Sequence, residues 1–560
     1  MGGLYLIISE ANGVNMDTKF TEAFLRNAGG ESDSSYEVDT TPAIHQGNYH
    51  QAVTMLSKRE IANYRQLNFT YGYHHTKIND TSTNYQQPFT DPILRKTRMY
   101  PELRLRPLRK LMCHGEVYNY ASIKESEGFC DRDLETTSDV EVVLPMYIKY
   151  GIEVALRRLR GDFSFVLTEN TNQFDIKSIN VYVARDPLGM RSLYMLQRVD
   201  GKGIFYMFTT EIKNIPLTLL SDPDYRVSEV PPGCYWSFAK GNQEEPFTRY
   251  FKFDVYRDIS KLTYTFPTPD QLGVVYNEIY TTLKRAVVDR YVLSKVPVGV
   301  LLSGFDSCAI LGVLVKSGVA DNINVFTIGR SEGSLAGECV EHLRKVYPDI
   351  TLHHHIIDIH NDDLILKRVE ETVYTIECTE FNTIKKSLAF TFLLQYISEK
   401  TNIKVLLSGE GLDELLGYTS LFQGDHQHFQ DMSIDMLSSL YKTENLKNNK
   451  VAGKYNLEIR CPYLDMDFIE LVLDIHPRMK LPQKYDYTKS PVSKYIVRKA
   501  IELHCDLPAS VLWAKMKCVS ESVKGISKCI DTLCNNSVQK CTEQLYFKNM
   551  FSNQFKITNI

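Results

Sequence analysis

The sequence predicts a two-part protein, in which a mixed α+β domain is followed by a parallel-sheet α/β domain. Three observations lead to this fold class. The chain of 560 residues is too long for a single hydrophobic core. Short strand-like runs separated by polar turns fill its first half. In its second half, apolar strands alternate with amphipathic helices, which is the order expected of βαβ units.

The first predicted domain covers residues 1–253, and its strand-like runs include residues 4–8, 180–184 and 204–209. A linker is predicted over residues 254–269, because this stretch contains Tyr, Thr and two prolines with little periodicity. The second domain covers residues 270–560. Its first predicted elements are a helix over 273–293, a strand over 298–302, a helix over 308–317 and a strand over 324–328.

Composition indicates an ordinary soluble globular protein, with 43% hydrophobic and 24% charged residues. The net charge of −4 provides no basic surface for nucleic acid. The apolar run at the N-terminus is too short for a signal peptide, and no segment is long enough to span a bilayer. The 12 cysteines form no C-x-x-C pairs, which favours reduced thiols. We therefore expect a cytoplasmic protein without nucleic-acid or membrane partners.

Two glycine-containing loops carry the strongest chemical signal. Residues 303–307 read S-G-F-D-S and residues 408–413 read S-G-E-G-L-D, and each loop follows a buried strand and precedes a helix. Such a turn directs backbone N–H groups and a helix N-terminus toward one point beyond the sheet edge. The acids Asp306, Glu410 and Asp413 would repel a phosphate unless a hard cation lay between them. The sequence therefore predicts a site for a nucleotide with Mg²⁺.

The two loops resemble those of asparagine synthetases. The first is similar to the S-G-G-x-D-S pyrophosphatase loop of ATP-cleaving amidoligases, and the second to the S-G-E-G-x-D-E-x-x-G-G-Y motif of asparagine synthetases. Further matches follow in family order at residues 115–120, 138–142, 159–163, 184–191, 326–329 and 457–465. The resemblance implies an Ntn-hydrolase-like αββα sandwich of the type 2 glutamine amidotransferase kind, followed by an α/β ATP-pyrophosphatase domain with helical additions.

The chemistry that the resemblance implies is a two-step amide synthesis with ATP and Mg²⁺. The β-carboxylate of aspartate attacks the α-phosphorus of ATP, pyrophosphate leaves, and ammonia then displaces AMP from the acyl-adenylate. The implied site residues are Leu301, Ser303, Gly304, Ser307, Ile328, Ser408 and Gly409 for ATP, Asp306, Glu410, Lys515 and Lys517 for catalysis, Asp306 and Asp413 for Mg²⁺, and Thr383 and Lys385 for aspartate.

Several positions of the second domain depart from the family pattern. The first loop is one residue shorter, which removes one N–H group from the anion site, and it carries the bulky Phe305. Lys385 replaces an arginine, so a point charge stands in place of a planar bidentate group. The catalytic lysine of the family aligns with Met516, which leaves Lys515 or Lys517 to take its place.

The first domain lacks the residue that family members use to hydrolyse glutamine. They expose an N-terminal cysteine, whose thiol is the nucleophile and whose amine is the base. Here Gly2 stands at that position, and the first cysteine is Cys113. His75 replaces the arginine that grips the glutamine carboxylate, and His114 replaces the asparagine of the oxyanion site. The residues of this pocket that still match the family are Gly115, Glu116 and Asp139.

These departures leave two functions open. One is an asparagine synthetase-like ligase that takes aspartate and ammonia, in preference to glutamine, as small-molecule substrates and forms a homodimer. The other is a catalytically degraded pseudoenzyme of the same fold, which acts as an interaction scaffold. A ligase with a different acceptor, as in lactam-forming or tRNA-modifying relatives, is disfavoured by the near-complete asparagine synthetase motif and by the absence of a basic face.

Overall fold

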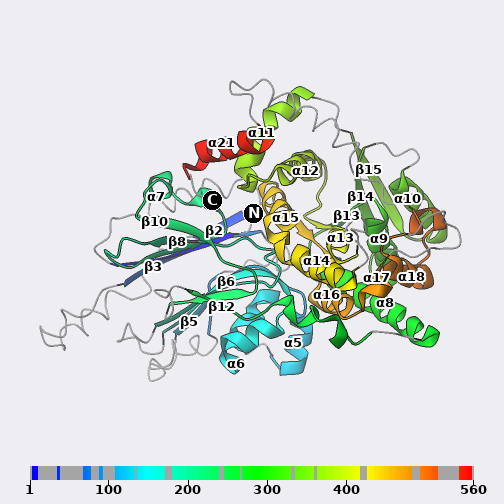
Figure 1. The fold of residues 1–560 in the computed structure, drawn as a ribbon, viewed down its shortest axis with the longest axis horizontal. Coiled ribbons are helices and arrows are strands. Elements are labelled where there is room, and N and C mark those ends of the chain that lie inside the picture. The colour runs from blue at the N-terminus through cyan, green and yellow to red at the C-terminus, as the bar shows by residue number, and fades with distance from the viewer. Residues whose placement is uncertain are drawn as a thin grey trace, which may run out of the picture. The chain divides into compact units, whose positions relative to one another are not determined.

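The computed structural model describes residues 3–10, 34–37, 67–76, 87–91, 108–130, 133–134, 136–170, 179–238, 245–264, 268–329, 334–358, 362–416, 425–481, 492–514 and 542–557. The chain forms two compact units (Figure 1). The first unit comprises Met1–Phe251, Glu377–Thr379 and Phe547–Ile560, and the second comprises Lys252–Ile376 and Glu380–Tyr546.

The first unit contains two antiparallel six-stranded sheets, with the strand orders β10-β8-β9-β1-β3-β2 and β12-β11-β7-β6-β5-β4. The strands of the first sheet are β1 (Gly3–Glu10), β2 (Ser34–Glu37), β3 (Leu67–Thr76), β8 (Tyr194–Arg198), β9 (Phe205–Thr209) and β10 (Tyr225–Glu229). The strands of the second sheet are β4 (Phe89–Thr90), β5 (Leu108–Val117), β6 (Gly161–Asn170), β7 (Ile179–Arg185), β11 (Cys234–Ser237) and β12 (Phe247–Arg249).

Helices cover the outer faces of these two sheets. The α-helices are α5 (Tyr120–Glu127), α6 (Val143–Arg158) and α7 (Leu217–Leu220), and short 3-10 turns lie at Asp139–Val142 and Ile212–Asn214. Helices α5 and α6 share a buried cluster with β5 and β6. Helix α7 shares another with β1 and β9. The layers therefore run helix, sheet, sheet, helix, which confirms the predicted sandwich.

Strand alternation explains how the two sheets of the first unit pack together. Leu4 and Leu6 of β1 join a buried cluster with Trp236 of the opposite sheet. Tyr5 and Ile7, which point to the other side of the same strand, belong to the cluster with α7. The continuous apolar run of β1, residues 4–8, therefore serves two hydrophobic layers at once, because both faces of this strand are covered.

The second unit is built on a five-stranded parallel sheet of order β15-β14-β13-β16-β17. The strands are β13 (Val298–Leu301), β14 (Asn322–Ile328), β15 (Thr351–Ile357), β16 (Val405–Leu407) and β17 (Glu458–Arg460). Strands β14 and β15 extend the sheet on one side of β13, and β16 and β17 extend it on the other. The carboxyl ends of β13 and β16 therefore meet where the strand order reverses, which is where open α/β sheets bind ligands.

The helices of the second unit connect and cover these strands (Figure 1). They are α8 (Pro269–Val292), α9 (Phe305–Ser317), α10 (Leu335–Val346), α11 (Asp362–Ile376), α12 (Phe381–Lys400), α13 (Leu412–Leu416), α14 (His426–Ser439), α15 (Glu444–Lys454), α16 (Met466–Leu473), α17 (Pro477–Lys480), α18 (Tyr495–His504) and α19 (Ala509–Leu512). Helix α21 (Glu543–Phe555) contains residues of both units. The parallel sheet with its helices confirms the predicted α/β class.

Two helices of the second unit begin earlier than the sequence predicts. Helix α8 begins at Pro269, because the Thr268 hydroxyl accepts from the Gln271 amide and the Gln271 side chain accepts from the Thr268 amide. Helix α9 begins at Phe305 rather than at residue 308. The early start of α9 places Asp306 in its first turn, so the first glycine-containing loop is short and continues directly into a helix.

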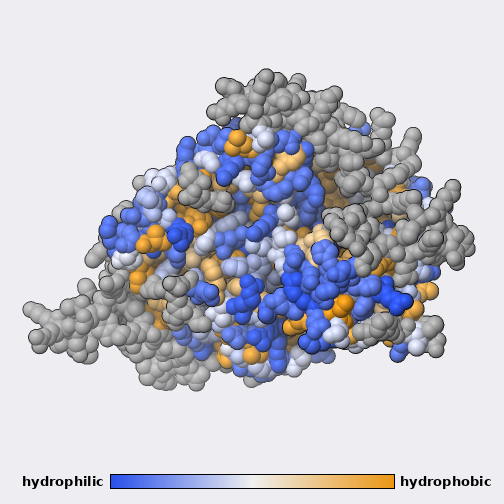
Figure 2. Space-filling view, in the orientation of Figure 1, coloured by the Kyte–Doolittle hydropathy of each residue, from blue (hydrophilic) through white to orange (hydrophobic). Residues whose placement is uncertain are grey.

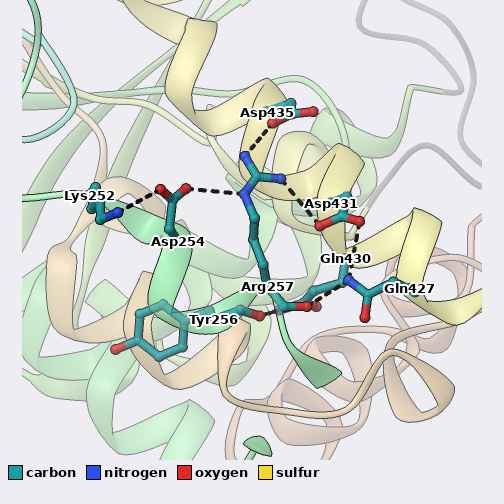
Figure 3. A network of polar contacts seen from close by, with 8 residues as sticks. All are labelled: Lys252, Asp254, Tyr256, Arg257, Gln427, Gln430, Asp431 and Asp435. Atoms are coloured by element: carbon teal, nitrogen blue, oxygen red, sulfur yellow. Dashed lines mark hydrogen bonds and ion pairs between the residues drawn. The ribbon is translucent and has the colours of Figure 1, made fainter. Parts of the chain in front are cut away.

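The segment predicted as a linker, residues 254–269, belongs to the second unit and is bound to it. In Figure 3, Arg257 reaches two carboxylates of α14, with Nη1 3.2 Å from Asp431 Oδ1 and Nη2 2.6 Å from Asp435 Oδ1. The side-chain amide of Gln427 donates to the backbone oxygen of Arg257 at 2.7 Å. This segment is therefore a docked strap along its described residues, and not a free spacer.

The surface of the second unit around α14 is mainly hydrophilic in the view of Figure 2. The Asp435 side chain on this helix is 67% exposed although it pairs with Arg257. No helix in the described part of the chain combines the length and the apolar character that a bilayer crossing requires.

Candidate active site

The first glycine-containing loop joins β13 to α9. The backbone N–H of Ser303 donates to Ser307 Oγ at 2.8 Å, and that hydroxyl donates to the Gly304 carbonyl at 3.1 Å. Ser307 thus closes the loop through its side chain. The first N–H groups of a helix have no intrahelical acceptor. The shortened loop therefore retains the helix N-terminus that an anion site requires.

The second loop follows β16 and lies against the first. A Cβ atom on Gly409 would lie 2.7 Å from the backbone nitrogen of Ser307 and 3.1 Å from Asp306 Cβ, so only glycine permits this approach. Gly411 has a φ of 103°, and a Cβ there would lie 2.5 Å from Leu464 Cδ2. The two glycines flank the predicted catalytic Glu410 and set the path of the loop that carries it.

Lys494 connects an acid of the first loop to an acid of α13. Its Nζ lies 2.6 Å from Asp306 Oδ2 and 2.5 Å from Asp413 Oδ1, and its side chain is only 2% exposed. Burial alone would lower the pKa of Lys494, but the two carboxylates outweigh burial and raise this pKa above 10.5. The backbone of Lys494 has a φ of 61°, which is unusual for a residue other than glycine. The ammonium group is therefore held charged between the two predicted metal ligands.

Glu410 has its own cation. Lys447 of α15 donates to Glu410 Oε1 at 2.5 Å, and the neighbouring Asn448 donates to Glu410 Oε2. The Lys447 side chain is 7% exposed and the Glu410 side chain is 25% exposed, so the lysine is buried and its carboxylate partner is partly exposed. Both oxygens of the predicted catalytic carboxylate are thus fixed by side chains of one helix.

The residues predicted to bind ATP lie at the carboxyl edge of the parallel sheet. Leu301 and Ile328 are the last residues of β13 and β14, which are neighbouring strands. Ser408 follows the last residue of β16, and its amide donates to the Arg460 carbonyl of β17 at 3.0 Å. The structure therefore brings these positions to one edge, although the sequence places them in three separate segments.

The predicted aspartate-binding residues lie on α12. Thr383 is buried in the first turn, where its amide donates to the capping carboxylate of Glu380 at 2.6 Å. Lys385 Nζ lies 3.5 Å from the centre of the Phe381 ring and 3.9 Å from Glu543 Oε1. Lys385 therefore already has a carboxylate neighbour within its own unit. The predicted catalytic lysines, Lys515 and Lys517, lie outside the described residues.

The remnant of the predicted glutamine pocket lies in the first unit. His114 and Glu116 occupy alternate positions of β5, opposite Ser164 and Asp162 of β6. His75 belongs to β3 of the other sheet, where it pairs with Ser35. Gly2 precedes β1 and lies outside the described residues.

Three residues in or against β5 have surroundings that explain them without a reaction on glutamine; two lie on the strand, and Asp139 begins the 3-10 turn Asp139–Val142. Gly115 has a φ of 133°, and a Cβ there would lie 1.8 Å from the Asp162 carbonyl oxygen, so no side chain fits. Asp139 Oδ2 accepts a hydrogen bond from the Val117 amide at 2.6 Å. Cys113 is buried, and burial raises the pKa of its thiol well above 9.0, so it is no replacement for a reactive terminal cysteine.

Lys447, Asn448 and Lys494 were missed by sequence reasoning. They belong to no motif that the sequence displays, and their segments are distant from the two loops. The available signal was electrostatic, because several acids at one buried site require buried cations. That argument predicts that lysines are present, but it does not say which of the chain's lysines they are.

Comparison with known proteins agrees with this architecture. Residues 108–216 match the family model described as a glutamine amidotransferase domain, and residues 278–425 and 422–546 match the model described as asparagine synthase. A probable glutamine-hydrolysing asparagine synthetase of Acanthamoeba polyphaga mimivirus is 29% identical over 491 residues, which cover 85% of this chain and 80% of that protein.

Two further proteins are also similar to this chain. The glutamine-hydrolysing asparagine synthetase of Gallus gallus is 28% identical over 438 residues, covering 75% of this chain and 73% of that protein. A solved structure, the U34-tRNA thiolase NcsA from Methanococcus maripaludis, is 13% identical with a TM-score of 0.21, covering 50% of this chain and 81% of that one.

The two loops at the edge of the parallel sheet, taken with the matched families, define the class of protein, an ATP-dependent carbon–nitrogen ligase preceded by an amidotransferase-type domain. Its substrates are accordingly small molecules. Within this class, the chain belongs to the asparagine synthetase family and is a divergent member of it.

Proposed function

We propose that the second unit converts aspartate to asparagine through a β-aspartyl-AMP intermediate and takes its nitrogen from ammonia. The observation that carries this proposal is the bridge formed by Lys494 between Asp306 and Asp413. It holds two acids and a cation beside the start of α9, at the sheet edge where a triphosphate would meet backbone N–H groups. The contact between Gly409 and the first loop supports the same proposal, because the shortened loop still meets its partner.

We propose that Asp306 and Asp413 hold Mg²⁺ together with the phosphates of ATP. Asp306 Oδ1 is buried and has no hydrogen-bond partner among the described residues, so it is an acceptor suited to a hard cation. Within the described ranges, no group of three or more His, Cys, Asp and Glu side chains could hold a metal ion. Phosphates would complete the ligand set, as is usual for Mg²⁺. The bound ion would offset the charge of the triphosphate.

The residues of the chain would act mainly by orientation and charge. Lys494 and the first turn of α9 would hold the phosphates in line with the attacking carboxylate. Leu301 and Ile328 would contact the adenosine, and Thr383 and Lys385 would bind aspartate. Glu410 would lie beside the reacting carboxylate. A catalytic role for Lys515 or Lys517 stays a prediction.

We propose that the first domain is structural, because glycine at position 2 has no side chain that can attack a carbonyl carbon. The kept residues Gly115 and Asp139 have backbone roles that do not require glutamine. Glutamate release from glutamine, measured with a coupled dehydrogenase for the native chain and for Gly2→Cys, tests this assignment. We expect none from the native chain, and clear release would overturn it.

The proposed domain limits along the sequence are residues 1–253 and 270–560, and residues 254–269, which join them in the chain, pack as part of the second unit. Association into a homodimer stays a prediction, which light scattering of the purified protein would check.

The test of the ligase is a single reaction. Purified protein is incubated with ATP, Mg²⁺, aspartate and ammonium, and pyrophosphate and asparagine are assayed together. We expect both products in equal amounts and neither without aspartate. A folded protein that releases no pyrophosphate would favour the pseudoenzyme. Pyrophosphate release that requires a carboxylate other than aspartate would indicate a different acceptor.

A further inference from the structure

A chain of alternating charges leads from α12 to the predicted catalytic carboxylate. Lys386 of α12 contacts Glu444 Oε1, and Lys447 Nζ lies 2.7 Å from Glu444 Oε2. Lys447 in turn donates to Glu410 Oε1 at 2.5 Å. Exposure falls along this series, from 52% for the Lys386 side chain to 7% for Lys447. The series therefore begins at the surface, passes through the buried Lys447 and ends at Glu410, whose side chain is 25% exposed.

Lys447 is held from several directions. Glu444 lies one helical turn before Lys447. The ammonium group of Lys447 lies 4.8 Å from the centre of the Phe390 ring of α12. Burial would lower the pKa of Lys447, but Glu410 and Glu444 raise it overall. The pKa of Glu444 is lowered to about 2, because Lys447 and Lys386 outweigh its burial. Both partners are therefore ionised across the physiological pH range.

The contacts of α12 distinguish two adjacent lysines. Lys385 lies beside the Phe381 ring and Glu543. Lys386, one residue later, is the lysine whose contacts lead through Glu444 to Lys447. Within the part of the chain that the structure describes, only Lys386 of these two lysines is connected, through Glu444 and Lys447, to the loop that carries the predicted catalytic acid.

From this arrangement we infer that Lys447 is a positioning residue for Glu410, held in place by Glu444 and Lys386. The inference rests on the proposed function, because it is that function that gives Glu410 a reacting partner. Lys447 fixes one carboxylate oxygen while Asn448 holds the other, so the carboxylate plane cannot rotate freely. Positioning of this kind matters at the transition state and little for the binding of ATP or aspartate.

The kinetic test compares Lys447→Met, Lys447→Arg and Lys454→Met in the full chain. Lys454 is a matched control, because it lies on the same helix and loses an equivalent ion pair, Nζ to Glu371 Oε1 at 2.5 Å. We expect Lys447→Met to lower kcat about 100-fold, with KM values for aspartate and ATP changed less than about threefold. Lys447→Arg should recover at least about a tenth of the wild-type rate, and Lys454→Met should stay within about threefold of it.

Three kinetic outcomes would overturn the inference. They are a Lys447→Met rate within about threefold of wild type, a Lys447→Arg variant no faster than Lys447→Met, and an equal loss in Lys454→Met. The last outcome would show that any lost ion pair of α15 disturbs the enzyme, and not the one that reaches Glu410.

A second measurement needs no catalysis, so it separates failure of this inference from failure of the proposed function. Thermal unfolding is compared for wild type, Lys447→Met, Glu410→Gln and the double variant. We expect Lys447→Met to lower Tm by less than half as much in the Glu410→Gln background as in wild type, because the two residues are coupled. Additive shifts would overturn the inference, even if the wild type proved inactive in the ligase assay.

Discussion

The end of β5 in the first unit and the paired loops of the second unit both keep residues that match the family pattern, yet these residues differ in what they do in the structure. At the end of β5, Gly115 is required by a close backbone approach and Asp139 by a backbone amide. In the second unit, Asp306 and Glu410 each have a buried lysine partner, Lys494 and Lys447. A matching residue therefore indicates retained chemistry only where no structural role already explains it.

Loss of the cation that bridges the second-unit loops should have the largest effect. Lys494→Met would leave Asp306 and Asp413, whose side chains are 22% and 35% exposed, without the buried cation that they share. We expect the free energy of unfolding to fall by about 2–4 kcal/mol, since partly buried carboxylates that lose their cation are penalised, but less than fully buried ones. Urea unfolding monitored by fluorescence measures this change. A fall below about 1 kcal/mol would mean that these acids are solvated and not held by Lys494.

Removal of acids in the second unit should slow the reaction, whereas a change at the end of β5 should not. We expect Asp306→Ala and Glu410→Ala each to lower aspartate-dependent pyrophosphate release by more than about 100-fold, since one such electrostatic contact is worth that much at a transition state. Glu116→Gln, a matched change at the end of β5, should leave the ammonia-dependent rate within about threefold. Near-wild-type turnover of either alanine variant would show that the active site has been assigned to the wrong residues.

Nucleotide binding should distinguish the two units without any turnover. We expect Mg-ATP at 100 times its dissociation constant to stabilise the second unit by about 2.7 kcal/mol. The shift should require Mg²⁺ and disappear in Asp306→Ala. Differential scanning fluorimetry across a titration of Mg-ATP measures it. An absent shift at millimolar Mg-ATP would favour the pseudoenzyme.

Lys480 is another buried lysine. Its effect on the free energy of unfolding should be smaller than that of Lys494 and should depend on pH. Lys480 donates to Gln430 Oε1 at 2.7 Å and to the Val472 carbonyl at 3.2 Å, and burial lowers its pKa from 10.5 to about 7. Unfolding therefore takes up a proton between these two pH values. The resulting cost to stability is complete below pH 7 and vanishes as the pH rises toward 10.5.

We accordingly expect Lys480→Met to be more stable than wild type by about 1–3 kcal/mol at pH 6, with a smaller difference at pH 10. Urea unfolding at both pH values checks the sign. A difference that does not change with pH would show that Lys480 remains charged in the native state.

Much of this architecture was predictable from the sequence, for identifiable reasons. The apolar run of β1 and the apolar strands before each loop reflect burial, which the hydrophobic pattern of a sequence reports directly. The start of α9 at Phe305 was not predicted, because periodicity begins only where side chains pack, and a glycine-containing turn continues into the helix without a break. Lys494 was not predictable, because its role depends on a tertiary approach between segments almost two hundred residues apart. The strap of residues 254–269 looked like a linker because ion pairs such as Arg257 with Asp435 leave no periodic pattern.

The contrast between the two units is tested most directly by the source of the amide nitrogen. One reaction contains ATP, Mg²⁺, aspartate, [15N]ammonium and unlabelled glutamine at equal concentrations, and the mass of the asparagine product is measured. If the second unit is a working ligase and the first has lost glutamine hydrolysis, the amide nitrogen of the product carries the label throughout. Asparagine with an unlabelled amide would show that the first unit still delivers nitrogen from glutamine, and would contradict the account.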